Sequence, residues 1–70
     1  MKESIKNSVQ KLRVAKRLTQ EDLALKVAVS RQTIISIEKG NYVPSVLLAL
    51  KLAKVFHAPV GDIFEITYEK

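Results

Sequence analysis

The 70-residue sequence predicts a small all-α domain of five helices, with extended ends that could pair as a short antiparallel sheet. Apolar residues recur at helical spacing along most of the chain. Ser or Thr precedes three of these apolar segments, where helix N-caps are expected. The chain shows no internal repeat and no linker, and 47% of its residues are hydrophobic. These features are typical of one folded domain and argue against disorder.

The first helix is predicted from Ile5, Val9 and Leu12, which recur at i, i+4 and i+7 and would form one apolar face. Asn7 or Ser8 would be its N-cap. Either side chain can accept a hydrogen bond from a backbone N–H of the first helical turn.

Two helices joined by a tight turn are predicted over residues 19–38. Thr19 would cap the first of them, and Asp22 would complete a capping box with Asp in place of Glu. Ser30 would cap the second helix, and Gly40 would end it. The residues expected to face the core are Leu23, Val27, Val29, Ile34 and Ile37.

A fourth helix is predicted from its N-cap, Ser45, to about Phe56. One of its faces would be apolar and would consist of Leu48, Leu52 and Val55. Pro59 suits the first position of a short fifth helix, over roughly residues 60–64.

The two ends of the chain have extended character. Ile66, Thr67 and Tyr68 are β-branched or aromatic, so residues 65–69 could form a strand, with residues 2–6 as its partner. The whole chain, residues 1–70, is interpreted as a single domain.

Composition excludes several kinds of protein. Cys is absent, so neither a disulfide framework nor a thiolate metal site is available. The longest apolar run, residues 46–56, contains two Lys and is too short to span a bilayer. The first residues are polar and lead into no apolar signal segment. We expect a cytoplasmic protein with no membrane partner.

An enzyme is not expected either. The single His, His57, stands near the end of a predicted helix, where it suits the helix dipole better than catalysis. Glu21 and Asp22 are adjacent, so they cannot converge on one face of a helix. We expect no catalytic residue, no metal and no cofactor, and we see no small-molecule effector site in the sequence.

The positive charge is unevenly distributed. The net charge is +5, and residues 1–40 hold nine Lys or Arg against four Asp or Glu, whereas residues 41–70 hold three of each. All the excess therefore lies in the half that contains the paired helices. An anionic partner such as double-stranded DNA is one interpretation, and an ordinary basic surface is the other.

Several segments of the sequence resemble the motifs of a known protein family. Residues 18–24 (LTQEDLA), 29–34 (VSRQTI), 37–40 (IEKG), 44–45 (PS) and 62–64 (DIF) resemble the helix-turn-helix domain of phage repressors and Cro proteins, the Xre type. The short stand-alone regulators of the cytolysin-operon repressor type are the most similar members. The resemblance implies a five-helix, lambda-repressor-like fold, with a core over residues 8–64 and the helix-turn-helix motif over residues 19–38.

The resemblance also implies which residues meet DNA. Arg can bond guanine and Gln can bond adenine in the major groove, so Arg31 and Gln32 are the main candidates for base contacts. Thr33 and Ser36 are secondary candidates. The residues expected to contact phosphates are Gln20, which could also brace Gln32, and Ser30, Lys39, Asn41 and Tyr42. The alternative for Arg31 and Gln32 is an exposed polar helix start, and the alternative for Tyr42 is packing against the fourth helix.

Two further positions are informative. Arg13 and Glu38 resemble a buried ion pair that joins the first helix to the third; two independent surface charges are the alternative. Ala28 occupies the turn where the family usually has Gly. If that residue is left-handed, Ala costs on the order of 1 kcal/mol.

The fourth helix is apolar on more than one side. Its surplus apolar residues would either cover the core beneath the chain ends or form a dimer contact. Members of the resembled family commonly dimerise through this region, and in the cytolysin-repressor type the chain ends pair as a sheet. A two-fold dimer would place two recognition helices about 34 Å apart, one turn of DNA. The residues expected at a homodimer interface are Val46, Leu47, Leu50, Ile66 and Tyr68.

We therefore interpret the chain as a sequence-specific DNA-binding transcriptional regulator. A small dimer reading a palindromic operator can block polymerase by occupying a promoter, so a repressor fits better than an activator. An antitoxin of the same fold, or a protein-interaction module that uses the apolar fourth helix, is the alternative.

Overall fold

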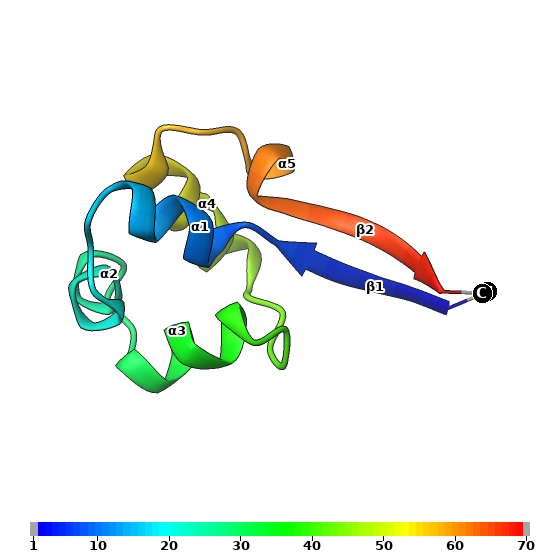
Figure 1. Cartoon of the computed structure of the whole chain (residues 1–70), viewed down its shortest axis with the longest axis horizontal. Helices are drawn as coiled ribbons and strands as arrows, with labels where there is room; N and C mark the ends of the chain where they lie inside the picture. Colours follow the sequence, from blue (N-terminus) through cyan, green and yellow to red (C-terminus); the bar gives the residue numbers. More distant parts are fainter. Residues whose placement is uncertain (1, 70) are drawn as a thin grey trace.

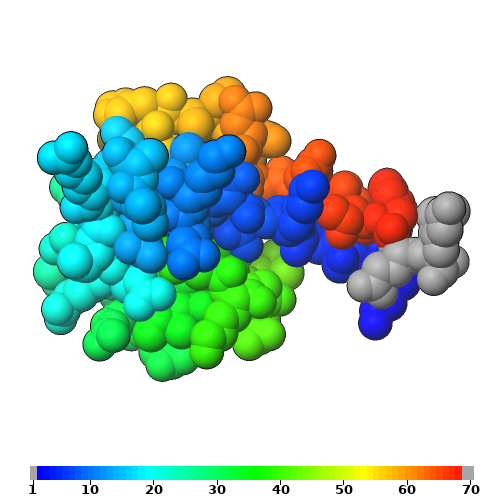
Figure 2. Space-filling view, viewed as in Figure 1, coloured from blue at the N-terminus to red at the C-terminus, as the bar shows by residue number. Residues whose placement is uncertain are grey.

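The computed structural model describes residues 2–69, in which five helices lie between two terminal strands (Figure 1). The elements in chain order are β1 (Lys2–Asn7), α1 (Val9–Ala15), α2 (Gln20–Lys26), α3 (Arg31–Glu38), α4 (Val46–Phe56), α5 (Val60–Ile63) and β2 (Phe64–Glu69). The helices form a rounded body, and β1 and β2 pair as an antiparallel ribbon that projects from it (Figure 2). The predicted all-α core of five helices with a terminal sheet is confirmed.

Two details of the prediction are wrong. Ile5 does not lie on the face of the first helix, because α1 begins only after Ser8 and Ile5 pairs with Ile66 in the ribbon. Spacings of four and seven residues fit a helix, but pairing between the chain ends takes precedence over that pattern. Pro59 is the N-cap of α5 and not its first helical residue.

The core lies where the helices meet. All five helices contribute fully buried side chains to it. The residues predicted to face inward from α2 and α3 are all among these buried side chains. Ala24 on α2 is 3% exposed, so a larger side chain there would force its neighbours in the core apart. The core cluster comprises Val9, Leu23, Ala24, Val27, Ile34, Ile37, Leu48, Leu52, Phe56 and Ile63.

Three helices begin at hydroxyl N-caps. The side chains of Thr19, Ser30 and Ser45 each accept a hydrogen bond from the backbone N–H three residues later. At α2 the capping box is complete, since the Asp22 carboxylate accepts from the Thr19 N–H at 2.9 Å. Each cap satisfies an amide of the first turn and so determines where the helix starts.

Four helices end in the same backbone turn. In each, a residue just past the helix is left-handed, and the next N–H bonds a carbonyl five residues back, as in a Schellman motif. After α3 the left-handed residue is Gly40, at φ +80°. After α1, α2 and α4 it is not glycine but Arg17, Ala28 and His57, with φ between +53° and +59°. The left-handed backbone considered for Ala28 is therefore present.

The ribbon has two unlike faces. Side chains alternate along each strand, so Ile5, Ile66 and Tyr68 share one face with Phe64, which packs against the core. The opposite face is polar: Ser4 and Thr67 hydroxyls lie 2.7 Å apart, and Lys6 pairs with Glu65. The apolar face thus continues outward from the core, with Ile66 and Tyr68 exposed.

Candidate nucleic-acid interface

Two polar side chains in the first turn of α3, those of Arg31 and Gln32, are exposed to solvent. The Ser30 hydroxyl accepts from the Thr33 N–H at 3.2 Å and lies 2.9 Å from the Thr33 hydroxyl. These two residues therefore stabilise the helix start through their own contacts. Arg31 and Gln32 between them are both exposed, at the end of the helix where the backbone N–H groups give a positive potential.

Two hollows flank this helix start. The first, of about 420 Å³, is lined by Arg31 together with residues of α1, α2 and their connection, and we call it the α1–α2 hollow. Its lining residues are Arg13, Arg17, Leu18, Thr19, Gln20, Glu21 and Arg31.

The second, the α3 hollow of about 360 Å³, contains most of the residues predicted to touch DNA. It is lined by Ser30, Gln32, Thr33, Ser36, Asn41 and Tyr42. Apart from Gln20 on α2, the predicted site residues thus lie along α3 and the segments that flank it (Figure 1). Lys39 is exposed at the C-cap of α3 and lines neither hollow.

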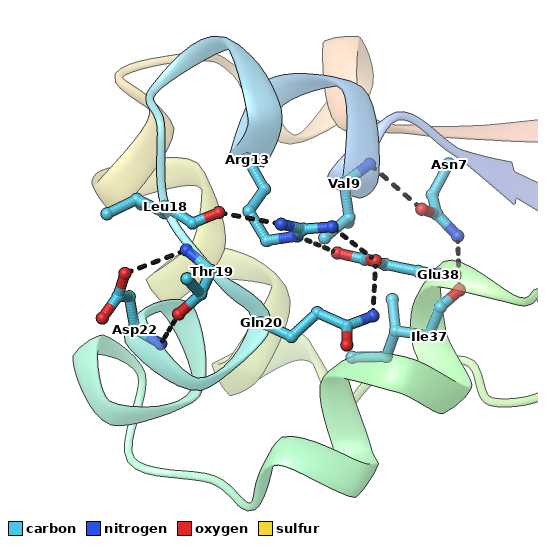
Figure 3. Close-up of polar contacts among 9 residues, drawn as sticks. All are labelled: Asn7, Val9, Arg13, Leu18, Thr19, Gln20, Asp22, Ile37 and Glu38. Atoms are coloured by element: carbon cyan, nitrogen blue, oxygen red, sulfur yellow. Dashed lines mark hydrogen bonds and ion pairs between the residues drawn. The ribbon is translucent and has the colours of Figure 1, made fainter.

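An ion pair joins α1 to the end of α3 (Figure 3). The Arg13 Nε donates to Glu38 Oε2 at 2.7 Å, and Nη2 donates to Oε1 at 3.3 Å. The two side chains are only 12% and 4% exposed. Arg13 Nη1 also donates to the Leu18 carbonyl at 2.8 Å, so the guanidinium ties both α3 and the α1–α2 connection to one point.

Gln20 extends this network in a way that the sequence did not indicate. Its Nε2 donates to Glu38 Oε1 at 3.1 Å, so the side chain braces Glu38 and not Gln32 (Figure 3). The first turn of α2 and the last turn of α3 are therefore held together by the same carboxylate. The Gln20–Glu38 hydrogen bond and the shared core therefore fix the angle between α2 and α3.

Asn7 supports α3 from the other side. Its Nδ2 donates to the Ile37 carbonyl at 2.9 Å, while its Oδ1 accepts from the Val9 N–H at 3.1 Å (Figure 3). Asn7 thus satisfies a free amide of α1, although Ser8 occupies the N-cap position and makes no side-chain cap. Only the paired chain ends bring Asn7 beside α3, so its link to α3 is a site-positioning contact that sequence periodicity could not reveal.

Arg17 is another residue that the sequence analysis did not single out. It is exposed, follows α1 in a left-handed conformation, and lines the α1–α2 hollow with Gln20 and Arg31. The signal in the sequence was weak, because a basic residue after a helix is also common where it serves only the helix dipole.

The carboxylate at the start of α2 is shifted toward its charged form. The Thr19 backbone N–H and then the Thr19 hydroxyl bond the Asp22 carboxylate and lower its pKa below the usual 3.8, and the charge of Lys26 acts in the same direction. Asp22 is therefore a stable negative charge at the positive end of α2.

The residues expected at a homodimer interface line neither of these two hollows, although Leu47 lines a further one with Thr33 and Tyr42. Val46, Leu47 and Leu50 on α4 are 54–76% exposed, and Ile66 and Tyr68 lie on the apolar face of the ribbon. Within residues 2–69, no helix is long and apolar enough to cross a membrane. The same residues contain no cluster of three or more His, Asp or Glu able to hold a metal ion.

Comparison with known proteins agrees with this geometry. The family model described as helix-turn-helix matches residues 9–63. An HTH-type transcriptional regulator of Methanocaldococcus jannaschii is 57% identical over 60 residues, which cover 86% of this chain and 91% of that protein. The transcriptional repressor RstR of the cryptic phage CTXphi of Vibrio cholerae is 32% identical over 57 residues, which cover 81% of this chain and 51% of RstR.

Two solved structures have the same fold. The restriction-modification controller protein C.AhdI of Aeromonas hydrophila superposes with a TM-score of 0.71 and 31% identity over 77% of this chain and 82% of its own. The transcriptional regulator VanUg gives a TM-score of 0.77 at 23% identity over 99% of this chain and 92% of its own. The chain therefore belongs to the helix-turn-helix family of the Xre/Cro type, and it is a DNA-binding transcriptional regulator and not an enzyme.

Proposed function

We propose that this regulator is a dimeric repressor that reads a palindromic DNA operator with α3. The observation that carries the proposal is the start of α3, where Arg31 and Gln32 are exposed while Ser30 and Thr33 bond each other. A regulator bound to chromosomal DNA acts in the cytoplasm, associated with the nucleoid.

Base readout rests on the two free side chains. Arg31 can donate two hydrogen bonds to guanine O6 and N7, and Gln32 can bond adenine N6 and N7. Each such pair contributes roughly 1–3 kcal/mol of discrimination against the wrong base. Thr33 and Ser36, which line the α3 hollow beside Gln32, take secondary base contacts.

Phosphate contacts would surround this centre and set the register of α3 in the groove. We assign them to the two hollows and the end of α3, where polar and cationic groups are exposed beside the readout residues. Arg17 joins the set because it lines the same hollow as Arg31. The proposed phosphate contacts are Arg17, Gln20, Ser30, Lys39, Asn41 and Tyr42.

Dimerisation is proposed from two apolar surfaces that the chain itself leaves uncovered. One is the α4 surface formed by Val46, Leu47 and Leu50, and the other is the ribbon face that carries Ile66 and Tyr68. A two-stranded ribbon alone is only marginally stable in water, so packing against a second copy would stabilise it. A two-fold axis would then place two α3 helices about one DNA turn apart.

Repression is favoured over activation because a repressor needs no contact with polymerase. A dimer that occupies a promoter excludes polymerase without any further contact. RstR, which is named a transcriptional repressor, shares 32% identity with this chain. This likeness supports the same direction of control here.

The test is selection of bound fragments from random DNA at about 150 mM salt, where weak phosphate attraction is reduced. We expect an enriched inverted repeat with half-sites about one helical turn apart. The double variant Arg31→Ala/Gln32→Ala should lose that enrichment while remaining folded.

The matched control is Gln10→Ala/Lys11→Ala. It removes the same two kinds of group from exposed positions on α1 that line neither hollow. This control should keep the selected motif. Enrichment that survives in the Arg31/Gln32 variant would contradict the readout assignment, and a single unrepeated half-site would contradict the palindromic dimer.

A further inference from the structure

One hollow of the described chain is lined mainly by cations and by none of the residues proposed to contact DNA. It has a volume of about 680 Å³, and we call it the lysine pocket. Its lining residues are Lys16, Leu18, Lys26, Lys51, Lys54, Val55 and His57. We propose that the lysine pocket binds a small anionic ligand of the nucleoside polyphosphate class.

The pocket is assembled from three separate parts of the chain. Lys16 is the C-cap of α1, Lys26 is the last residue of α2, and Lys51 and Lys54 lie on α4. In the sequence these lysines are up to 38 positions apart, so only the packing of three helices brings them together. The α4 end and the α1 end lie on the opposite side of the body from α3 (Figure 1).

The cations of the pocket are not neutralised by neighbouring acids. Within the described part of the chain the ion pairs are Lys6–Glu65 and Arg13–Glu38, and neither involves a pocket lysine. No acidic side chain lines the pocket. Asp22 lies outside the lining, and its charge interacts with Lys26 one helical turn away.

Helix dipoles account for only part of this charge. Three helices end at the pocket, and each C-terminus carries about half a negative charge, which totals about −1.5. Four lysines contribute four positive charges, so a surplus of about +2.5 remains before Asp22 is considered. Neutralising the helix ends would need fewer lysines than the pocket contains, and an anionic ligand accounts for the surplus.

The apolar part of the lining indicates more than a bare anion. Leu18 and Val55 are half-buried among the lysines, of which Lys51 is also half-buried, and the lysine side chains add aliphatic stems. The volume lies within the range of roughly 300–1,000 Å³ that small-molecule sites occupy. A planar base or similar ring could cover the apolar residues while its phosphates meet the lysines, which is the geometry of a nucleoside polyphosphate.

The test is calorimetric titration of the full chain with ATP and, separately, with inorganic tripolyphosphate at about 150 mM salt. We expect saturable binding of one ATP per chain, and tighter binding of ATP than of tripolyphosphate. Lys51→Gln/Lys54→Gln should weaken ATP binding by about tenfold, the effect of two lost charge contacts.

The matched control is Lys2→Gln/Lys11→Gln, which removes the same charge from exposed residues outside the pocket and should change ATP affinity less than about twofold. Equal losses in both variants would overturn the proposal, because the attraction would then be diffuse. Absence of saturable binding would also overturn it.

Equal affinity for ATP and tripolyphosphate would overturn the assigned ligand class. Displacement of ATP by duplex DNA would show that the pocket belongs to the DNA surface and would overturn the proposal. Unchanged thermal unfolding would establish that the variants remain folded.

Discussion

The buried guanidinium of Arg13 holds three parts of the molecule in place. It bonds Glu38 at the end of α3 and the Leu18 carbonyl between α1 and α2, while Glu38 also receives the Gln20 amide. Burying two charges is unfavourable, and their mutual attraction offsets that cost only while both partners are present. The geometry of α3, the helix proposed to read DNA, therefore depends on two residues that are not themselves assigned to DNA.

Removing one partner of this ion pair should be strongly destabilising. Arg13→Met leaves Glu38, whose side chain is 4% exposed, without its countercharge, and we expect a loss of about 3–5 kcal/mol in the free energy of unfolding. Urea denaturation followed by circular dichroism measures it.

The double variant Arg13→Met/Glu38→Leu is the control, because it removes both charges. It should recover most of the lost stability, since an apolar pair of similar size can replace a buried ion pair. A single variant as stable as the parent chain would contradict the assignment.

Within single elements, the helix N-termini follow the residue preferences of helix caps, whereas most of the C-terminal turns do not. Hydroxyl N-caps start α2, α3 and α4 as the sequence predicts. The C-terminal turns all require a left-handed residue, yet glycine occupies only one of the four. The other three turns form because core packing outweighs a local strain of about 1 kcal/mol each.

Exchanging residues at two of these turns should have opposite effects. Ala28→Gly removes left-handed strain and should stabilise the fold by about 0.5–1 kcal/mol, after the greater freedom of Gly in the unfolded chain is subtracted. Gly40→Ala introduces the same strain and should destabilise by about 1 kcal/mol, since nothing lies within 4 Å of the added methyl group. Thermal unfolding measures both, and shifts of the same sign would contradict the explanation.

The capping box of α2 should make stability sensitive to acid. The pKa of Asp22 is lower in the folded chain than its usual 3.8, so the charged form is favoured by folding. Its contribution is complete above that value and is lost as the pH falls through the lower, folded-state pKa. Asp22→Asn keeps a carbonyl oxygen that can accept from Thr19 but has no charge.

We therefore expect this variant to melt below the parent chain at pH 7, with the difference vanishing toward pH 2. Melting temperatures measured across this range by circular dichroism test it. A difference that persists unchanged at pH 2 would show that the charge of Asp22 is not the cause.

In the whole molecule, the helical body and the ribbon differ in how much of their apolar surface the chain itself covers. The body closes its own core, with Leu23, Ile34, Ile37 and Leu52 fully buried. The ribbon lengthens the molecule to 36 Å, against 23 and 21 Å in the other directions, and one of its faces remains apolar and exposed. Together with the uncovered side of α4, it presents the kind of surface that a second copy would bury.

The dimer is tested by placing charge on α4. Leu47→Glu/Leu50→Glu should convert a dimer into a monomer, because two carboxylates would meet their symmetry mates in a desolvated interface. Analytical ultracentrifugation gives the mass of each form.

Leu25→Glu/Val14→Glu is the matched control, because both residues are exposed apolar side chains on other helices. This variant should remain dimeric. A monomeric parent chain, or dissociation of both variants alike, would contradict the proposed α4 interface.

Local patterns along the chain predict the number of helices, the hydroxyl N-caps of α2, α3 and α4, and the inward faces of α2 and α3, because these depend on spacing and on hydrogen bonds between near neighbours. Residues such as Thr19 and Asp22 carry that information within a single helical turn. The family was indicated by the resemblance of its motifs.

Which distant residues meet depends on tertiary packing. Ile5 fitted both the first helix and the terminal strand 2–6, and pairing with Ile66 places it in the ribbon. Gln20 braces Glu38, Asn7 holds α3, and Arg17 joins Arg31 at one hollow. The lysine pocket likewise exists only where three helices converge. Contacts of this kind depend on how the helices cross and on how the chain ends pair, which no periodicity along the chain encodes.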